Sequence, residues 1–192
     1  MKGVYLFLAD GFEDIEALAT HDVLRRGGVP LQLVSISEDP FVVSSHGLTI
    51  GAEAFLPDLE ISHAGTTEKD LMIFPGGMPG TKHLAACKPL VAAMKAHYAA
   101  GGSLAAICAA PGLVLGQLDD LSGVTFTCFD GFATLPESKG AVFAPKAAIR
   151  SGRIITGRSA GHAVAFALEI LRFLRPEKYE EVREALFLQW TA

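Results

Sequence analysis

Residues 102–115 read Gly-Ser-Leu-Ala-Ala-Ile-Cys-Ala-Ala-Pro-Gly-Leu-Val-Leu, and they predict a sharp turn that carries a reactive side chain. The apolar run from Leu104 to Ile107 is typical of a buried parallel strand. Residues 110–116 predict the first turns of a helix, because Pro111 suits an early helical position, where its missing N–H costs nothing. Cys108 is therefore expected on the turn between this strand and this helix.

A turn of this kind aims a side chain outward at the carboxyl edge of a sheet, as a nucleophile elbow does. The N-terminus of the following helix favours negative charge, and so favours the thiolate of Cys108 over the thiol. The small neighbours Ala106, Ala109 and Ala110 leave room for a tight turn and for a ligand. The alternative is a buried cysteine that packs as a small hydrophobic residue, which is common in proteins.

On either side of this turn, predicted strands alternate with predicted helices. This alternation indicates an α/β fold with a mostly parallel sheet and helices on both of its faces. No linker and no internal repeat is visible, so residues 1–192 are interpreted as a single domain. Strands are predicted at 3–8, 31–36, 71–74, 104–107, 124–127 and 141–143, helices at 13–26, 89–99, 160–174 and 177–188, and hairpins at 41–54 and 147–156.

Composition excludes several classes of function. The chain has 192 residues, half of them hydrophobic and 19% charged, with a net charge of −5, and no cluster of Lys and Arg suggests nucleic-acid binding. Its three cysteines include no Cys-x-x-Cys pair, which argues against a disulfide scaffold or a zinc site. No metal site is expected, because His21, His63, His83 and His97 lack ligand spacing and are expected at the surface. Trp190 is expected to dock the last helix.

The sequence also argues against a membrane protein. Residues 96–118 contain no Asp, Glu, Lys or Arg and are long enough to span a bilayer. However, Gly101-Gly102 and Pro111-Gly112 divide them into a helix end, a buried strand and a second helix. The apolar run from Val4 to Leu8 is too short for a signal peptide, so the cytoplasm is the expected compartment.

Three loops are expected beyond the carboxyl ends of the strands, where ligands bind in folds of this kind: residues 9–16, 75–80 and 108–112. Glycines let backbone N–H groups approach an anion, so the amides near Gly76 and Gly77 could form an oxyanion hole with that of Ala109. A simple turn is the alternative for the glycine pair. Glu13 and Asp14 are expected to be solvated, whereas Glu16 borders the buried face of its helix and could reach the thiol.

Taken in order, five pieces of the chain resemble the ThiJ/PfpI superfamily, and within it the branch of the parkinsonism-associated deglycase. The pieces are residues 9–16, 22–28, 75–77, 105–111 and 156–158, and together they extend over about residues 3–175. The resemblance implies a flavodoxin-like three-layer sandwich, commonly as a homodimer and without a cofactor. It also implies that Cys108 is the reactive thiolate, that Glu16 is its protonated carboxyl partner, and that the amides near Gly77 and Ala109 bind an oxyanion or an oxidised sulfur.

The departures from the family pattern concern histidine. The protease-like branch has His directly after the nucleophile, where this chain has Ala109. The deglycase branch often has His after the strand at 124–127, where this chain reads Thr-Cys-Phe-Asp. Asp130 and Cys128 are therefore candidates for a place near the site. Arg158 and His162 are further candidates for the pocket, although a helix-capping or surface role is the alternative for His162.

Two hypotheses for function use the same residues. In the first, which the resemblance implies, Cys108 attacks the aldehyde of a 2-oxoaldehyde such as methylglyoxal and Glu16 moves the proton, and protein adducts of these aldehydes are the alternative substrates. The partner is then a small carbonyl compound, and the chemistry is that of a glyoxalase or deglycase. In the second, Cys108 is an oxidative-stress sensor that forms a sulfenic or sulfinic acid, with chaperone behaviour or partner binding as the output. A cysteine hydrolase or amidase is a weaker alternative, because no His follows Cys108.

Overall fold

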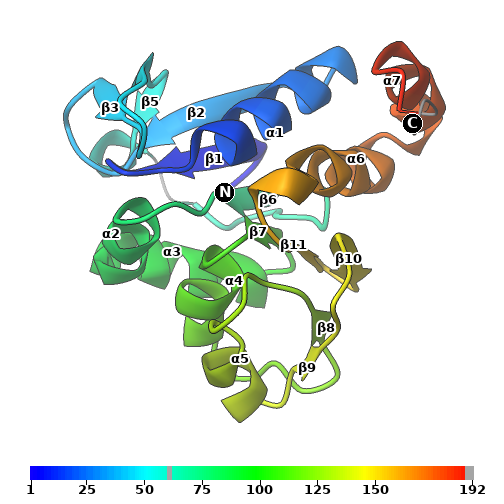
Figure 1. Cartoon of the computed structure of the whole chain (residues 1–192). Helices are drawn as coiled ribbons and strands as arrows, with labels where there is room; N and C mark the ends of the chain where they lie inside the picture. The colour runs from blue at the N-terminus through cyan, green and yellow to red at the C-terminus, as the bar shows by residue number, and fades with distance from the viewer. Residues whose placement is uncertain (60–61, 189–192) are drawn as a thin grey trace.

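The centre of the fold is a seven-stranded sheet, described by a computed structural model that covers residues 1–59 and 62–188 (Figure 1). The spatial order of its strands is β10-β11-β7-β6-β1-β2-β5, and every neighbouring pair is parallel except β10 and β11. These strands are β1 (Val4–Leu8), β2 (Leu31–Ser35), β5 (Ala54–Phe55), β6 (Leu71–Phe74), β7 (Ser103–Ile107), β10 (Ala148–Ser151) and β11 (Ile154–Gly157).

Helices cover both faces of this sheet (Figure 1). α1 and α6 pack on one face, and α2, α3 and α4 pack on the other. The chain therefore folds as a flavodoxin-like α/β sandwich, as predicted. The helices are α1 (Asp14–Arg26), α2 (Gly80–Ala86), α3 (Lys88–Ala99), α4 (Ala110–Leu113), α5 (Thr134–Ser138), α6 (Ala163–Leu174) and α7 (Tyr179–Ala185), with short 3-10 turns at Leu56–Asp58, Leu115–Gln117, Ala160–His162 and Pro176–Lys178.

The central strands are apolar throughout because both of their faces are buried. In β1, Leu6 and Leu8 face the layer of α1 and α6, whereas Phe7 between them faces the opposite layer. There Phe7 stacks on Phe74 of β6, with ring centroids 5.7 Å apart. Successive side chains of a strand point to opposite faces, so each of these strands contributes to two cores at once.

Several elements differ from the predictions. The predicted hairpin at 41–54 is shorter: β3 (Phe41–Val43) pairs with β4 (Thr49–Gly51), and Ala54 belongs to β5 of the central sheet. The segments at 124–127 and 141–143 stay outside that sheet and form a separate pair, β8 (Thr125–Phe126) and β9 (Val142–Phe143). α2 was not predicted, because it begins on glycine and has no long apolar stripe.

His97 is a correction to the sequence analysis, because the structure buries it completely. Its Nε2 lies 3.0 Å from the carbonyl oxygen of Asp70, and burial lowers the pKa of His97 to about 4. The ring occupies space that only glycine leaves open: a Cβ on Gly102 would lie 2.1 Å from Nε2. Trp190, predicted to dock the last helix, lies outside the described residues.

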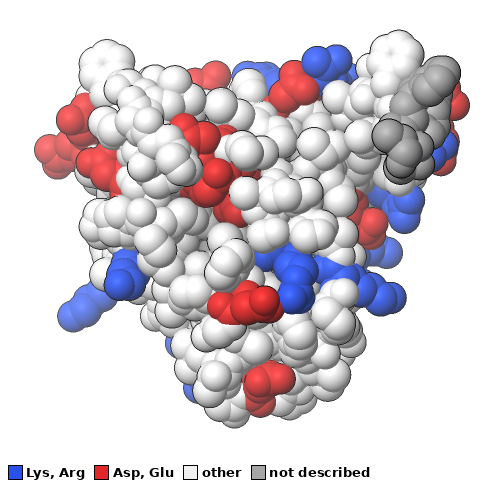
Figure 2. All heavy atoms as spheres, in the orientation of Figure 1, with Lys and Arg blue, Asp and Glu red and all other residues white. Residues whose placement is uncertain are grey.

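The helices are short, and the surface carries charged side chains of both signs (Figure 2). Across the described residues, every helix is too short or too polar to cross a membrane. On the face drawn in Figure 2, acidic side chains gather mainly on the left of the upper half, and basic side chains gather on the right just below the middle.

Candidate active site

The site lies where the carboxyl ends of four neighbouring strands meet. Glu16 follows β1, Gly76 follows β6, and Cys108 follows β7, while residues 159–161 follow β11. The chain runs from β1 to β2 on one side and later returns to β6 on the other side of β1. Such a reversal leaves a crevice at the carboxyl edge, which is where ligands bind in open α/β sheets.

Cys108 lies on the turn between β7 and α4, as the sequence predicts. Its backbone φ of 64° is in the left-handed region, which is uncommon for a residue with a side chain and costs conformational energy. Two backbone hydrogen bonds hold it there: Cys108 N–H donates to the Gly157 carbonyl at 3.0 Å, and its own carbonyl accepts from Phe129 N–H at 2.8 Å. Neighbouring loops therefore fix the direction of the thiol.

Glu16 lies in the first turn of α1 and has no exposed surface. Its Oε2 accepts a hydrogen bond of 2.7 Å from Gly76 N–H. Its Oε1 has no hydrogen-bond partner within the described part of the chain. Burial raises the pKa of Glu16 to about 7, although the Gly76 amide and the nearby Cys108 side chain act to lower it. A proton on this carboxyl group is therefore available near neutral pH.

The two glycines after β6 allow these groups to meet. A Cβ on Gly76 would lie 2.6 Å from both Cys108 Cβ and Glu16 Oε2, so any side chain there would separate the pair. Gly77 has a φ of 94°, and a Cβ on it would lie 2.4 Å from the Glu13 backbone nitrogen. The alternative of a simple turn does not explain such close approaches on both residues.

The environment of Cys108 differs from the predicted effect of a helix N-terminus. α4 has only four residues, and burial together with the charge of Glu16 raises the pKa of the thiol to about 12. The amides of Ala109 and Gly77 act in the opposite direction. Because each acid disfavours the charge of the other, Cys108 and Glu16 titrate as one coupled pair that holds a single proton over a wide pH range.

A cavity of about 460 Å³ opens above this pair. Its walls are mostly apolar, and its charged side chains are those of Glu13 and Glu16. Sequence reasoning missed the aromatic part of these walls, because Phe129 and Phe132 belong to a loop remote from Cys108 in the sequence. The lining residues are Glu13, Glu16, Gly77, Met78, Cys108, Ala109, Phe129, Phe132, Ser159, Ala160 and Gly161.

Arg158, Asp130 and His162, the predicted pocket residues, do not line this cavity. Arg158 Nη2 donates to Asp130 Oδ1 at 2.7 Å, and the Arg158 guanidinium lies over the Phe143 ring, so its side chain fastens two loops together. His162 Nδ1 lies 2.9 Å from Ser159 Oγ, at the start of α6. Arg158 and Asp130 therefore pair with each other and His162 pairs with Ser159, and none of the three is among the residues that line the cavity.

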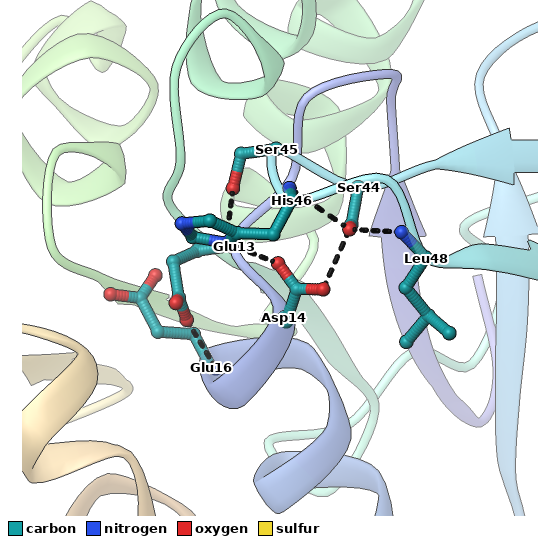
Figure 3. A network of polar contacts seen from close by, with 7 residues as sticks. All are labelled: Glu13, Asp14, Glu16, Ser44, Ser45, His46 and Leu48. Atoms are coloured by element: carbon teal, nitrogen blue, oxygen red, sulfur yellow. Dashed lines mark hydrogen bonds and ion pairs between the residues drawn. The ribbon is translucent and has the colours of Figure 1, made fainter.

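A polar network joins the start of α1 to the turn between β3 and β4 (Figure 3). Asp14 accepts from Ser44 Oγ at 2.6 Å and pairs with His46 Nδ1 at 2.8 Å. Ligand atoms of Glu13, Asp14 and His46 lie within 4.8 Å of one another, a spacing suited to a metal ion. Both oxygens of Asp14 are already engaged, so the geometry is accounted for by an ion pair, and Asp14 raises the pKa of His46.

Comparison with known proteins gives a consistent result. A family model described as the DJ-1/PfpI family matches residues 2–173. Protein DJ-1 homolog A of Arabidopsis thaliana is 34% identical over 98% of this chain and 47% of its own length, so the chain spans about half of that relative. The glutathione-independent glyoxalase DJR-1.2 of Caenorhabditis elegans is 31% identical over 92% of this chain and 90% of that protein. The structure of oxidized Toxoplasma gondii DJ-1 superposes with a TM-score of 0.85 at 27% identity, covering 97% of this chain and 98% of that one.

Proposed function

The chain belongs to the DJ-1/PfpI family, and from that premise we propose that it is a cysteine-dependent, cofactor-free glyoxalase-type enzyme. Its substrates would be 2-oxoaldehydes such as methylglyoxal, or their adducts on proteins. The observation that carries this proposal is the placement of Cys108 beside the buried carboxyl group of Glu16, at the floor of a cavity large enough for a small carbonyl compound. A relative named as a glutathione-independent glyoxalase supports it.

The first step forms a bond between Cys108 Sγ and the aldehyde carbon. The electron pair of the C=O double bond moves to its oxygen, which accepts hydrogen bonds from the amides near Gly77 and Ala109. The Glu16 carboxylate, present near neutral pH, takes the proton of the thiol as Sγ attacks and passes it to this oxygen, and the product is a hemithioacetal. A carboxyl group with a pKa near 7 suits this role, because it both gives and takes protons at that pH.

The next steps isomerise and release the substrate. The Glu16 carboxylate removes the proton from the former aldehyde carbon, and the electron pair moves toward the neighbouring ketone to give an enediolate. Glu16 returns this proton to the ketone carbon, and the hydroxyl proton of the sulfur-bound carbon passes to the neighbouring oxygen, which gives a thioester with an adjacent hydroxyl group. Water hydrolyses this thioester, which frees the Cys108 thiol and a 2-hydroxy acid such as lactate. Oxidation of one carbon balances reduction of the other, so no cofactor is needed.

A second candidate function is a peroxide sensor. It is favoured by the absence of His, Lys and Arg from the cavity walls formed by residues 1–59 and 62–188, which leaves Glu16 as the base nearest the thiol. Cys108 Sγ would attack one oxygen of hydrogen peroxide, and the O–O bond would break. The products would be a sulfenic acid on Cys108 and a molecule of water. A second peroxide would give the sulfinic acid, with chaperone behaviour or partner binding as the output. The proposed compartment for either function is the reducing cytoplasm.

Lactate formed from methylglyoxal tests the first candidate. Purified protein in the presence of a strong chelator is expected to produce lactate, because no step requires a metal. The Cys87→Ala variant should retain this activity, since Cys87 lies at the junction of α2 and α3 and outside the cavity. Absence of lactate from the wild type, together with stoichiometric oxidation by peroxide, would contradict the enzyme and favour the sensor.

We also propose a homodimer, which the family resemblance implies. Large apolar side chains are exposed on α1 and on the adjoining β3–β4 segment: Ile15 (55%), Leu18 (41%), Val43 (42%) and Leu48 (42%). The network around Asp14 holds these two segments together, so the side chains form one surface that a second copy could cover.

Sedimentation measures this association. The wild type is expected to have twice the mass of one chain, and Ile15→Glu is expected to halve it, because a charge would be buried in the contact. Val142→Glu, at an equally exposed residue of β9, serves as the control and should leave the mass unchanged. A monomeric wild type at micromolar concentration would exclude the homodimer.

A further inference from the structure

We propose that the cavity selects 2-oxoaldehydes that carry a large, uncharged apolar group, best an aromatic ring, and discriminates against those with a carboxylate or phosphate group. This inference rests on the proposed function and deepens it by naming the substrate class. It comes from three features of the cavity: an aromatic wall, the rigid attachment of that wall to Cys108, and the sign of the charges on the lining.

The aromatic wall consists of Phe129 and Phe132. Their ring centroids lie 6.5 Å apart with an interplanar angle of 59°, and both residues line the cavity. Phe129 is 47% exposed, so part of its ring is open to a ligand in the cavity. Rings in a tilted arrangement of this kind leave a face and an edge for a third ring. An aromatic substituent on the substrate would cover this surface, whereas the methyl group of methylglyoxal would leave most of it in water.

The wall is attached directly to the reactive turn. Phe129 N–H donates to the carbonyl of Cys108 itself at 2.8 Å. The next residue, Asp130, is held by the ion pair with Arg158 at 2.7 Å. Phe132 is seated against α4, where a Cβ on Gly112 would lie 2.7 Å from Phe132 Cβ. Because these contacts fix the rings relative to the sulfur, the wall can orient the carbonyl group that Cys108 attacks.

The charges on the lining disfavour anions. Glu13 and Glu16 supply the acidic groups, and among the described residues no Lys, Arg or His contributes to the cavity walls. Asp14 adds a carboxyl group in the first turn of α1, and Figure 2 shows acidic atoms gathered over this end of the helix. The amides near Gly77 and Ala109 serve the single oxyanion formed at the reacting carbon. A second negative group on the substrate would find no cation and would face two carboxyl groups.

Turnover tests the preference directly. The ratio of kcat/KM for phenylglyoxal to that for methylglyoxal is expected to exceed 1 in the wild type, and Phe129→Ala is expected to lower this ratio at least about tenfold. Phe41→Ala removes a ring that is 62% exposed on β3, outside the cavity, and should leave the ratio unchanged. Equal use of both aldehydes, or a ratio that Phe129→Ala does not alter, would overturn the inference while leaving the glyoxalase proposal in place.

Alkylation of Cys108 tests the same preference without turnover. The probes are N-phenyl iodoacetamide, iodoacetamide and iodoacetate, each with its rate divided by its rate with a free thiol in solution. The expected order is phenyl, then neutral, then anionic, and Phe129→Ala should remove the advantage of the phenyl probe while Phe41→Ala keeps it. The reverse order would overturn the inference. If this order holds but no aldehyde is converted, the proposed function fails and the selectivity of the cavity stands as a property of binding.

Discussion

Cys108→Ala is expected to lower kcat/KM for 2-oxoaldehydes at least about 10³-fold, down to the rate without protein. The reason is that every proposed step passes through the bond to sulfur: without it no hemithioacetal forms, and Glu16 has no acidic C–H within reach. The backbone that carries the side chain is set by contacts that alanine keeps, namely the hydrogen bonds to Gly157 and Phe129. Initial rates of lactate formation, with protein folding verified by circular dichroism, measure this effect.

Two further variants test whether the loss of activity is specific to the thiol of Cys108. Cys128→Ala removes a buried cysteine of a neighbouring loop and should lower stability more than activity, because Cys128 packs in a hydrophobic core and does not line the cavity. Cys108→Ser replaces the thiol with a hydroxyl group, which is slightly smaller and a much weaker nucleophile, and should be as inactive as the alanine variant. Turnover that survives in Cys108→Ala would contradict the proposed mechanism at its first step.

The central strands could be predicted from the sequence because burial on both faces demands nearly continuous apolar residues. Leu71–Phe74 and the run before Cys108 show this pattern, and both are strands of the sheet. The segments at 124–127 and 141–143 show a similar pattern but lie outside it. Each forms a strand of only two residues, and the place beside β11 is taken by β10, whose hairpin forms locally. Competition for an edge of a sheet is a property of the whole chain, which no single segment reveals.

Some residues of the site could likewise be predicted from the sequence, and others could not. Cys108, Glu16 and the glycine pair could be predicted because each follows a predicted strand closely, so the topology alone brings them together. The aromatic wall depends on how a distant loop folds back, which is decided by the contact of Phe129 with Cys108 and of Arg158 with Asp130. The charged and imidazole side chains of Arg158, Asp130 and His162 were expected in the cavity, but they pair with other side chains and do not line it.

Glu16→Gln is expected to slow both the alkylation of Cys108 and the turnover of 2-oxoaldehydes at pH 7. Alkylation should fall at least about tenfold and turnover at least about 10²-fold, because glutamine cannot transfer a proton. The physical reason lies in the coupled pair. Glu16 loses its proton at a pKa of about 7, and the carboxylate that results can take the proton of the thiol as Cys108 reacts, while the amides of Ala109 and Gly77 stabilise the negative sulfur.

The pH dependence of alkylation shows whether Glu16 assists the reaction of the thiol or repels its anion. In the wild type, alkylation should rise with pH around 7, whereas in Glu16→Gln the rise should move above pH 9, because a buried thiol then titrates alone. Glu13→Gln is the matched control: it removes a carboxyl group one helical turn away, and its effect should be much smaller. Faster alkylation in Glu16→Gln would mean that the Glu16 carboxylate only repels the thiolate in the wild type and does not take the proton of the thiol.

The same variant has an expected effect on stability that a purely structural role would not produce. The pKa of Glu16 rises from 4.5 to about 7 on folding, so between these values the folded protein holds a proton that the unfolded chain releases. Stability therefore decreases as the pH rises through this range, by about 3 kcal/mol for this one group, and changes no further above it. Glutamine carries no charge, so Glu16→Gln should be more stable than the wild type at pH 8 and not at pH 4. Urea unfolding at the two pH values measures the difference, and a stability gain that is equal at both would show that Glu16 is not a buried, titrating acid.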